Sequence, residues 1–181
     1  MSNKNRDAPA GGRRLILLRH AKSDWPDGVD DKKRPLADRG RKAASLMGDY
    51  LEREGLVPDL VLVSTAERTQ QTWGRVKTAF SQAPEVRDAD AIYEAPAETL
   101  MSVLKGVEPA FRVVMMIGHN PGMEDLAAKL IGGGDPEARR RISEKYPTGG
   151  LAVIDFTADT WQAIGSASGV LERFVTPRSL V

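Results

Sequence analysis

The chain has 181 residues, with 26 lysines and arginines, 25 aspartates and glutamates, two histidines and no cysteine. This length favours one domain, and the lack of cysteine excludes a disulfide framework, a thiol nucleophile and a cysteine zinc site. Its 41% hydrophobic and 28% charged residues are typical of a globular protein, and no apolar run approaches the roughly 18 residues of a membrane span.

Charge and composition set the first residues apart from the rest. Residues 1–14 carry four basic and one acidic side chain, which leaves 22 basic and 24 acidic side chains beyond them. Because nucleic-acid binding depends on neutralising phosphates, a domain with an excess of acidic charge is not expected to bind nucleic acid. We expect residues 1–13 to form a flexible tail and residues 14–181 a single domain. The tail lacks the apolar segment of a secretory signal, so a cytoplasmic location is expected.

Hydrophobic spacing beyond the tail alternates between two types. Short continuous apolar runs predict buried strands, whereas apolar residues three and four apart predict amphipathic helices. In chain order the pattern predicts a strand at 15–18, a loop at 22–36, a helix at 38–54, a strand at 60–63, a helix over 69–80, a short strand at 91–93, a helix over 100–107, a strand at 113–117, a helix at 120–131, and a strand at 151–156 that can pair with 161–164 as a hairpin.

Several polar, proline and glycine residues mark the ends of these helices. Ser64 or Thr65 is expected to cap the helix after the second strand. Asn120 and Pro121 are expected to be the N-cap and the first residue of a later helix, and the three glycines at 132–134 to end it. These expected helix ends support the predicted alternation of strands and helices along the chain.

The alternation predicts an α/β fold: a three-layer sandwich with a mostly parallel central sheet and helices on both faces. The carboxyl ends of parallel strands meet at one edge of a sheet, and ligands bind there. The residues that directly follow each strand are therefore the candidates for a functional site.

Both histidines of the chain follow predicted strands, accompanied by two arginines. Arg19 and His20 follow the first strand, Arg68 follows the second, and His119 follows the strand at 113–117. Guanidinium groups match phosphate oxygens and a neutral imidazole is a competent nucleophile, so the set indicates a phosphoryl pocket with a histidine nucleophile. Taken alone, Arg68 can be a solvated helix residue and His119 a turn support. A zinc site would lack an obvious third ligand.

The surrounding segments closely resemble the histidine phosphatase superfamily, which also contains phosphoglycerate mutase, and above all its SixA-type phosphohistidine phosphatases. The superfamily has an Arg-His pair after its first strand, an arginine in an S-x-x-x-R pattern and a second histidine after glycine. Arg19, His20, Arg68 and His119 match these positions. The resembling segments span most of the chain in family order: LILLRHAKSDW at 15–25, RPLADRGRKAA at 34–44, VLVSTAERTQQT at 61–72, VMMIGHNPGMEDLA at 114–127 and YPTGGLAVIDF at 146–156.

The resemblance implies a phosphoglycerate mutase-like fold and a role for each of the four residues. His20 would attack phosphorus and become a phosphohistidine, while Arg19, Arg68 and His119 would hold the phosphoryl oxygens, with no metal and no other cofactor. We expect the flanking arginines to lower the pKa of His20 below its ordinary value of about 6.5. A hydrogen bond from its other ring nitrogen to a backbone carbonyl would fix the tautomer.

The resemblance leaves the general acid open. Many superfamily members place a carboxylic acid beside the leaving oxygen, and Glu94 is the first candidate here, with Asp24 the second. Each can equally be an exposed loop carboxylate. The SixA-type branch is thought to lack a well-placed acid, which suits a phosphoramidate because imidazole leaves more easily than an alkoxide.

The expected activity is a metal-independent phosphatase for phosphohistidine on a protein, such as a histidine phosphotransfer protein, or for a small phosphomonoester. A short chain favours the protein substrate because it leaves little room for a lid, although the loops at 22–36 and 132–150 could cover the site. The alternatives are a non-catalytic module that binds phosphate or phosphoproteins, and a mutase.

Other charged and aromatic residues near these motifs have an architectural interpretation. Arg34 or Lys32 could contact a substrate, but a solvated charge run is favoured. The three arginines at 139–141 could steer an acidic partner, but a solvated helix face is favoured. Trp25 could form a partly exposed wall of the pocket.

Overall fold

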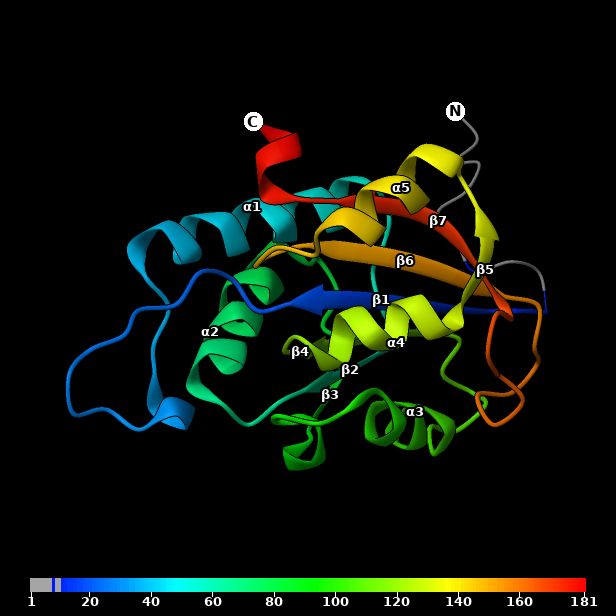
Figure 1. Cartoon of the computed structure of the whole chain (residues 1–181), viewed down its shortest axis with the longest axis horizontal. Helices are drawn as coiled ribbons and strands as arrows, with labels where there is room; N and C mark the ends of the chain where they lie inside the picture. Colours follow the sequence, from blue (N-terminus) through cyan, green and yellow to red (C-terminus); the bar gives the residue numbers. More distant parts are fainter. Residues whose placement is uncertain (1–7, 9–10) are drawn as a thin grey trace.

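The computed structural model describes residue 8 and residues 11–181. Its strands are β1 Arg13–Arg19, β2 Leu60–Val63, β3 Glu85–Asp88, β4 Val113–Gly118, β5 Ile131–Gly134, β6 Leu151–Phe156 and β7 Gly169–Val175. Its α-helices are α1 Asp38–Arg53, α2 Glu67–Val76, α3 Ala97–Lys105, α4 Gly122–Leu130 and α5 Pro136–Glu144, and short 3-10 helices occupy η1 Asp31–Lys33, η2 Lys77–Ala79, η3 Asp90–Ile92 and η4 Pro177–Leu180 (Figure 1). None of the described helices is long and apolar enough to cross a membrane. Of the predicted tail, residues 1–7, 9 and 10 lie outside the described residues, and Arg13 already belongs to β1.

The described strands form one mixed sheet in the order β3-β2-β4-β1-β6-β7-β5. β1 is parallel to β4, β4 to β2 and β2 to β3, so these four strands end at the same edge. β6 is antiparallel to both β1 and β7, and β5 is parallel to β7. The carboxyl end of β7 therefore lies at the same edge as that of β1. The predicted α/β class is confirmed, and the reversed β6 makes the sheet mixed.

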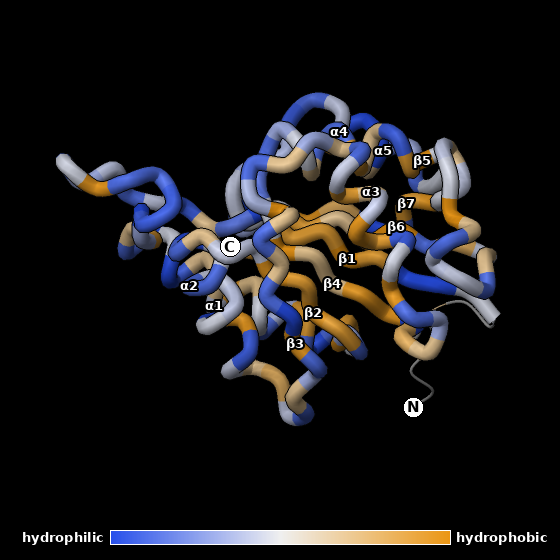
Figure 2. Tube along the Cα trace, turned by 90° about the horizontal axis from the view of Figure 1, so that it is seen from below, coloured by the Kyte–Doolittle hydropathy of each residue, from blue (hydrophilic) through white to orange (hydrophobic). Residues whose placement is uncertain are grey.

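Side chains along β1 alternate between two core clusters. Leu15 and Leu17 belong to the cluster that includes buried residues of α3, α4 and α5, and Ile16 and Leu18 belong to the cluster of α1 and α2. Because helices cover both sets of side chains, every strand residue from 15 to 18 is apolar and buried. Figure 2 shows these strands as a central apolar band bordered by more polar helices and loops.

The prediction of a short strand at 91–93 is wrong. Residues Asp90–Ile92 form η3, in which Ile92 is buried, and the strand next to β2 is β3, Glu85–Asp88. β3 lies at the edge of the sheet, and its side chains are exposed or half-buried. An edge strand that buries so little has no apolar pattern for sequence analysis to detect.

The hairpin predicted between residues 151–156 and 161–164 is also wrong. The apolar side chains of Trp161 and Ile164 do not belong to a strand but fill the core cluster of α3, α4 and α5. The strand that pairs with β6 is β7. The glycines at 132–134 do follow the end of α4, but they continue as β5 beside β7.

The helix caps differ in detail from the prediction. The N-cap of α2 is Ala66, without a side-chain hydrogen bond, so neither Ser64 nor Thr65 caps the helix. The hydroxyl of Thr65 donates to Asp90 instead, and that of Ser64 faces His119. The sequence places these hydroxyls correctly after the strand, but they contact other loops.

Helix α4 begins one residue later than predicted. Pro121 is its N-cap and Gly122 its first residue, and the Asn120–Pro121 peptide bond is cis. The Asn120 side chain still accepts a hydrogen bond from the Glu124 N–H at 3.2 Å, which satisfies one of the free N–H groups of the first turn.

Candidate active site

The four residues that the sequence singles out lie together at the carboxyl edge of the sheet. Arg19 is the last residue of β1 and His20 follows it, His119 follows β4, and Arg68 lies in the first turn of α2. The ring centroids of His20 and His119 are 5.3 Å apart. The charges of both arginines help to lower the pKa of each histidine. The fold thus brings two cations and two imidazoles to one place.

His20 has a defined tautomer. Its side chain is buried, and Nδ1 lies 2.8 Å from the carbonyl oxygen of Ala21. A carbonyl oxygen only accepts, so Nδ1 carries the hydrogen and the neutral ring has its lone pair on Nε2. Burial, followed by the charges of nearby arginines, lowers the pKa of His20 to about 4. The pKa is lowered as expected, but loss of hydration is a larger cause than the arginines.

His119 lies beside His20 and is held by two neighbours. Its Nε2 is 2.7 Å from the hydroxyl oxygen of Ser64, and the ring of Tyr93 meets it edge-on with 5.5 Å between centroids. Burial, then coupling to a protonated His20 and the charge of Arg68, lower the pKa of His119 to about 3. His119 is therefore neutral at pH 7.

Both arginines are anchored by part of the guanidinium group only. Arg19 donates from Nη1 to the Tyr146 carbonyl at 3.0 Å, and Arg68 donates to Asp31. Arg19 Nε, Arg68 Nε and His119 Nδ1 are three of the four buried side-chain nitrogens that have no hydrogen-bond partner in the described part of the chain. Buried polar atoms are normally paired, so this concentration suits a ligand with several acceptor oxygens.

The loop between β1 and α1 supplies residues that sequence analysis missed or misjudged. In η1, Asp31 accepts hydrogen bonds from Arg68, from Arg34 and from the hydroxyl of Tyr93. The Tyr93 bond, with those of the arginines, holds the pKa of Asp31 well below its usual range. Arg34 is only 6% exposed, so its interpretation as a solvated charge is wrong. The loop projects beyond the carboxyl end of β1 in Figure 1, and its residue Asp31 contacts the site through Arg68.

Two other residues of this loop lie further out. Lys32 forms an exposed ion pair with Asp90, with 2.6 Å between Nζ and Oδ1. Trp25 is 74% exposed, and the guanidinium carbon of Arg34 lies 3.2 Å from its ring centroid. Only the sheet topology and the loop's return path bring Asp31 and Tyr93 together, which explains why no motif marks either residue.

The two candidate acids are both exposed and are connected to this cluster through different residues. Glu94 is exposed, with a φ of 53°. Burial first, and then nearby carboxylates that include Glu94, raise the pKa of Tyr93 to about 12. Because Tyr93 packs against His119, Glu94 lies at the rim of the cluster. Asp24 is exposed as well, and its backbone carbonyl accepts a hydrogen bond from Arg34 Nε at 3.0 Å.

The backbone of the loop before β6, which includes Tyr146 and Gly149, holds the Arg-His pair in position. The Gly149 N–H lies 3.1 Å from the carbonyl oxygen of Arg19 and 3.0 Å from that of His20. Gly149 has a φ of 75°, which glycine adopts without steric cost. The Tyr146 carbonyl accepts from Arg19 and, at 3.0 Å, from the Asn120 side chain. This loop therefore fixes the backbone on which the Arg-His pair stands.

Comparison with known proteins agrees with this arrangement. Residues 15–94 match the model of the histidine phosphatase superfamily, branch 1. The chain is similar to a solved structure of SixA from Agrobacterium tumefaciens, for which phosphohistidine phosphatase activity is proposed. The two sequences are 32% identical and the structures have a TM-score of 0.78. The match covers 91% of this chain and 98% of that one. This chain belongs to the histidine phosphatase superfamily.

Two further proteins are similar to this chain over most of its length. SixA from Nakamurella multipartitia, whose activity is likewise a proposal, is 28% identical with a TM-score of 0.81, covering 93% of this chain and 98% of that one. An uncharacterized protein of Mycobacterium tuberculosis is 37% identical over 163 residues, which are 89% of this chain and all of the relative.

The superfamily match covers only part of the site. It includes Arg19, His20, Arg68 and Glu94 but ends before His119, which β4 brings to the edge. Within residue 8 and residues 11–181, no three histidine, aspartate or glutamate side chains gather as a metal-binding group. At the site of this superfamily member, the buried nitrogens without a partner in the described chain are Arg19 Nε, Arg68 Nε and His119 Nδ1, and His20 Nε2 carries a lone pair.

Proposed function

We propose that the chain is a cytoplasmic phosphatase that acts, without a metal, through a phosphohistidine on His20. Its substrate would be phosphohistidine on a protein or a small phosphomonoester. The observation that carries the proposal is the hydrogen bond from His20 Nδ1 to the Ala21 carbonyl, which leaves a lone pair on Nε2. Burial keeps this ring neutral at pH 7, and the likeness to SixA-type proteins supports the phosphohistidine substrate.

The first chemical step forms a bond from His20 Nε2 to phosphorus while the bond from phosphorus to the leaving group breaks. Charge on the phosphoryl oxygens is stabilised by N–H donors on Arg19, Arg68 and His119, each of which has a buried nitrogen without a partner in the described chain. His119 Nδ1 carries the hydrogen for this purpose when the Ser64 hydroxyl donates to Nε2.

The second step is attack of water on the phosphohistidine. The bond from phosphorus to His20 Nε2 breaks, both protons of the water leave with the inorganic phosphate, and the imidazole returns neutral with its hydrogen on Nδ1. The leaving group of the first step takes up a proton, and Glu94 is the proposed donor for an alkoxide, with Asp24 as the second candidate. Phosphohistidine needs less help, because its leaving group is an imidazole.

The test is phosphate release by wild type and His20→Ala, each supplied with a phosphorylated histidine phosphotransfer protein and with an aryl phosphate, in the presence of a chelator. We expect wild type to act on the phosphoprotein and the variant to lose more than about a thousandfold in rate. Thermal melting of the variant is the control for folding. If wild type releases no phosphate from either substrate but is stabilised by phosphate, the chain is a binding module and the proposal fails.

A further inference from the structure

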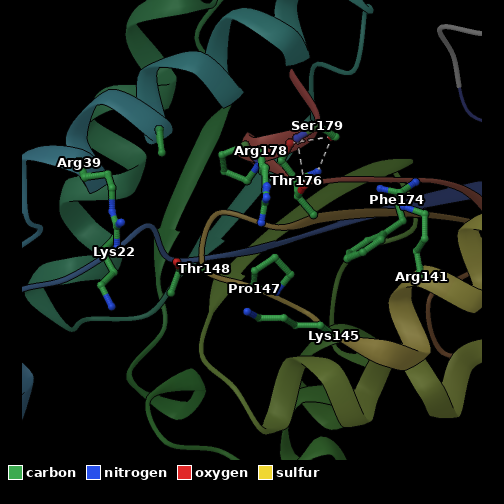
Figure 3. A pocket seen from close by; sticks show the side chains of 12 residues that line it. Lys22, Arg39, Arg141, Lys145, Pro147, Thr148, Phe174, Thr176, Arg178 and Ser179 are labelled. Atoms are coloured by element: carbon green, nitrogen blue, oxygen red, sulfur yellow. Dashed lines mark hydrogen bonds between the residues drawn. The ribbon is translucent and has the colours of Figure 1, made fainter. Parts of the chain in front are cut away.

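A groove of about 640 Å³ lies beside the candidate active site, at the carboxyl end of β7. Figure 3 shows Arg39 and Lys22 on one side of it, Lys145 and Arg141 on the other, and Arg178 between them. Polar and apolar residues complete its lining: Ala43, Pro147, Thr148, Phe174, Thr176, Pro177 and Ser179. Its size is that of a site that holds a ligand or a short peptide segment.

The charge of this groove is unbalanced. Five basic side chains line it and no acidic one does. None of the five forms an ion pair with a carboxylate among the described residues, whereas the whole chain has a net charge of only +1. Concentrated like charges destabilise a folded protein and attract ions of opposite sign, so the groove suits a partner with several negative charges.

The run of arginines at 139–141 shows how selective this arrangement is. Arg140 is paired with Glu137 and Glu144 on the exposed face of α5. Arg141 instead enters the groove, where its guanidinium lies 5.4 Å from the ring centroid of Phe174. The solvated helix face expected from sequence therefore describes Arg140, while Arg141 contributes to the basic groove.

The groove shares a wall with the active site. Lys145, Pro147 and Thr148 line the groove, and the same loop binds the backbone of Arg19 and His20 through Gly149. Lys22, only two residues after His20, also lines it. β1 and β7 end at the same edge of the sheet, with only β6 between them. A substrate bound at His20 can thus extend over Thr148 into the groove.

We propose that this basic groove docks an acidic segment of a protein whose phosphorylated residue occupies the active site. The inference rests on the proposed phosphatase function and names its substrate class. The negative charges of a small phosphomonoester lie on the phosphate group that binds at His20. Such a substrate therefore has few further charges that could bind the five cations of the groove. An acidic peptide segment supplies several carboxylates, and the exposed heads of Lys22, Arg39, Lys145 and Arg178 can each adjust to them.

The experiment uses two phosphohistidine peptides of equal length, one flanked by glutamates and the other by glutamines. The enzymes are wild type, Arg39→Gln/Arg178→Gln in the groove, and Arg75→Gln/Lys105→Gln as a control that removes two exposed charges elsewhere. We expect wild type to favour the acidic peptide by about tenfold in kcat/KM at low salt, and to lose that preference near 0.5 M salt, roughly where screening is strong. The groove variant should lose most of the preference, and the control variant should keep it.

Charge reversal supplies a gain of function that misfolding cannot imitate. Arg39→Glu/Arg178→Glu should favour a third peptide flanked by lysines over the acidic one, while an aryl phosphate reports that its active site is intact. Equal turnover of the acidic and neutral peptides by wild type would overturn the docking proposal and leave the phosphatase standing. Equal turnover combined with pyrophosphate inhibition that the groove variant loses would assign the groove to a small anion, and would also overturn it. If wild type hydrolyses the aryl phosphate but no peptide, the docking proposal is overturned and the phosphatase stands. If it hydrolyses neither, the proposed function fails and the docking proposal with it.

Discussion

Asp31 holds Arg68 by its backbone and its side chain together. Arg68 Nη1 lies 2.7 Å from the Asp31 carbonyl oxygen, and Nη2 lies 3.1 Å from its carboxylate. The same carboxylate binds Arg34 and Tyr93. Two fixed contacts set the plane of the guanidinium and leave Arg68 Nε without a partner in the described chain. Asp31 is thus a positioning residue for a proposed phosphate ligand.

Replacing Asp31 by asparagine should impair substrate binding more than turnover. Asp31→Asn keeps the backbone contact to Arg68 but loses the charged one, so we expect kcat/KM to fall about tenfold, mainly through KM. Asp30→Asn is the matched control, because Asp30 is an exposed neighbour in the same loop. Steady-state kinetics on an aryl phosphate decide the question. Equal behaviour of the two variants would show that the carboxylate does not position Arg68.

Neither histidine should titrate in the usual range. Burial is the first cause that lowers the pKa of His20 to about 4 and that of His119 to about 3. Nitrogen NMR of the imidazoles should therefore show neutral rings from about pH 8 down to about pH 5, with hydrogen on Nδ1 of His20. Spectra of His20→Gln and His119→Gln assign the signals. A midpoint near 6.5 for either ring would contradict the buried arrangement.

The same two histidines should make the fold less stable in acid. Their folded pKa values lie below the unfolded value of about 6.5, so protons bind the unfolded chain more tightly. Their contribution to the free energy of unfolding is complete above about pH 6.5 and is lost as pH falls through about 4 for His20 and about 3 for His119. Urea unfolding at several pH values measures this slope. The His20→Gln/His119→Gln variant should show a shallower slope, and an unchanged slope would refute the assignment.

The role of Glu94 can be separated from that of Asp24 by varying the leaving group. If Glu94 donates the proton, Glu94→Gln should slow hydrolysis of an alkyl phosphate by about a hundredfold and that of phosphohistidine by less than about threefold. Asp24→Asn should change neither rate. Rate constants on both substrates are the readout. A large loss in Asp24→Asn alone would transfer the role to Asp24, and no loss in either would mean that the enzyme works without a carboxylic acid.

Close packing between α1 and the loop after His20 should make Gly40 sensitive to substitution. A Cβ atom at Gly40 would overlap the backbone carbonyl of Lys22, so Gly40→Ala should lower the free energy of unfolding by about 2 kcal/mol and reduce activity as the loop moves. Gly74 in α2 has open space at the Cβ position, so Gly74→Ala should stabilise the fold by about 0.5 kcal/mol. Denaturant unfolding of both variants compares them. Similar free energies of unfolding for the two variants would show that the contact between Gly40 and the Lys22 carbonyl is not rigid.

The central strands were predictable because both of their faces are covered. Continuous apolar runs mark β1, β2 and β4, and the side chains of the candidate site lie at the carboxyl ends of these strands or shortly after them. The edge strand β3 exposes most of its side chains and left no such pattern. Trp161 and Ile164 resembled a strand because they are apolar, but they fill the core from a loop.

The missed part of the candidate site depends on contacts between distant segments. Asp31 lies in a polar loop and meets Arg68 37 positions later, and Tyr93 follows a 3-10 helix. Local sequence carries no information about such meetings, so neither residue could be singled out. The pKa of His20 was predicted in direction but not in its main cause, because burial of a side chain is set by the whole fold.

β6 runs against both of its neighbours, so its amino end reaches the edge where β1 and β7 finish. The segment leading into β6 therefore meets the Arg-His pair with peptide groups, at Tyr146 and Gly149, while Lys145 and Thr148 face outward into the basic groove. Peptide groups are the same whatever the side chain. Under the proposed function, exchanging the outward residues would change which partner the groove binds without altering the peptide groups that hold the Arg-His pair, so this segment is a starting point for engineering partner choice.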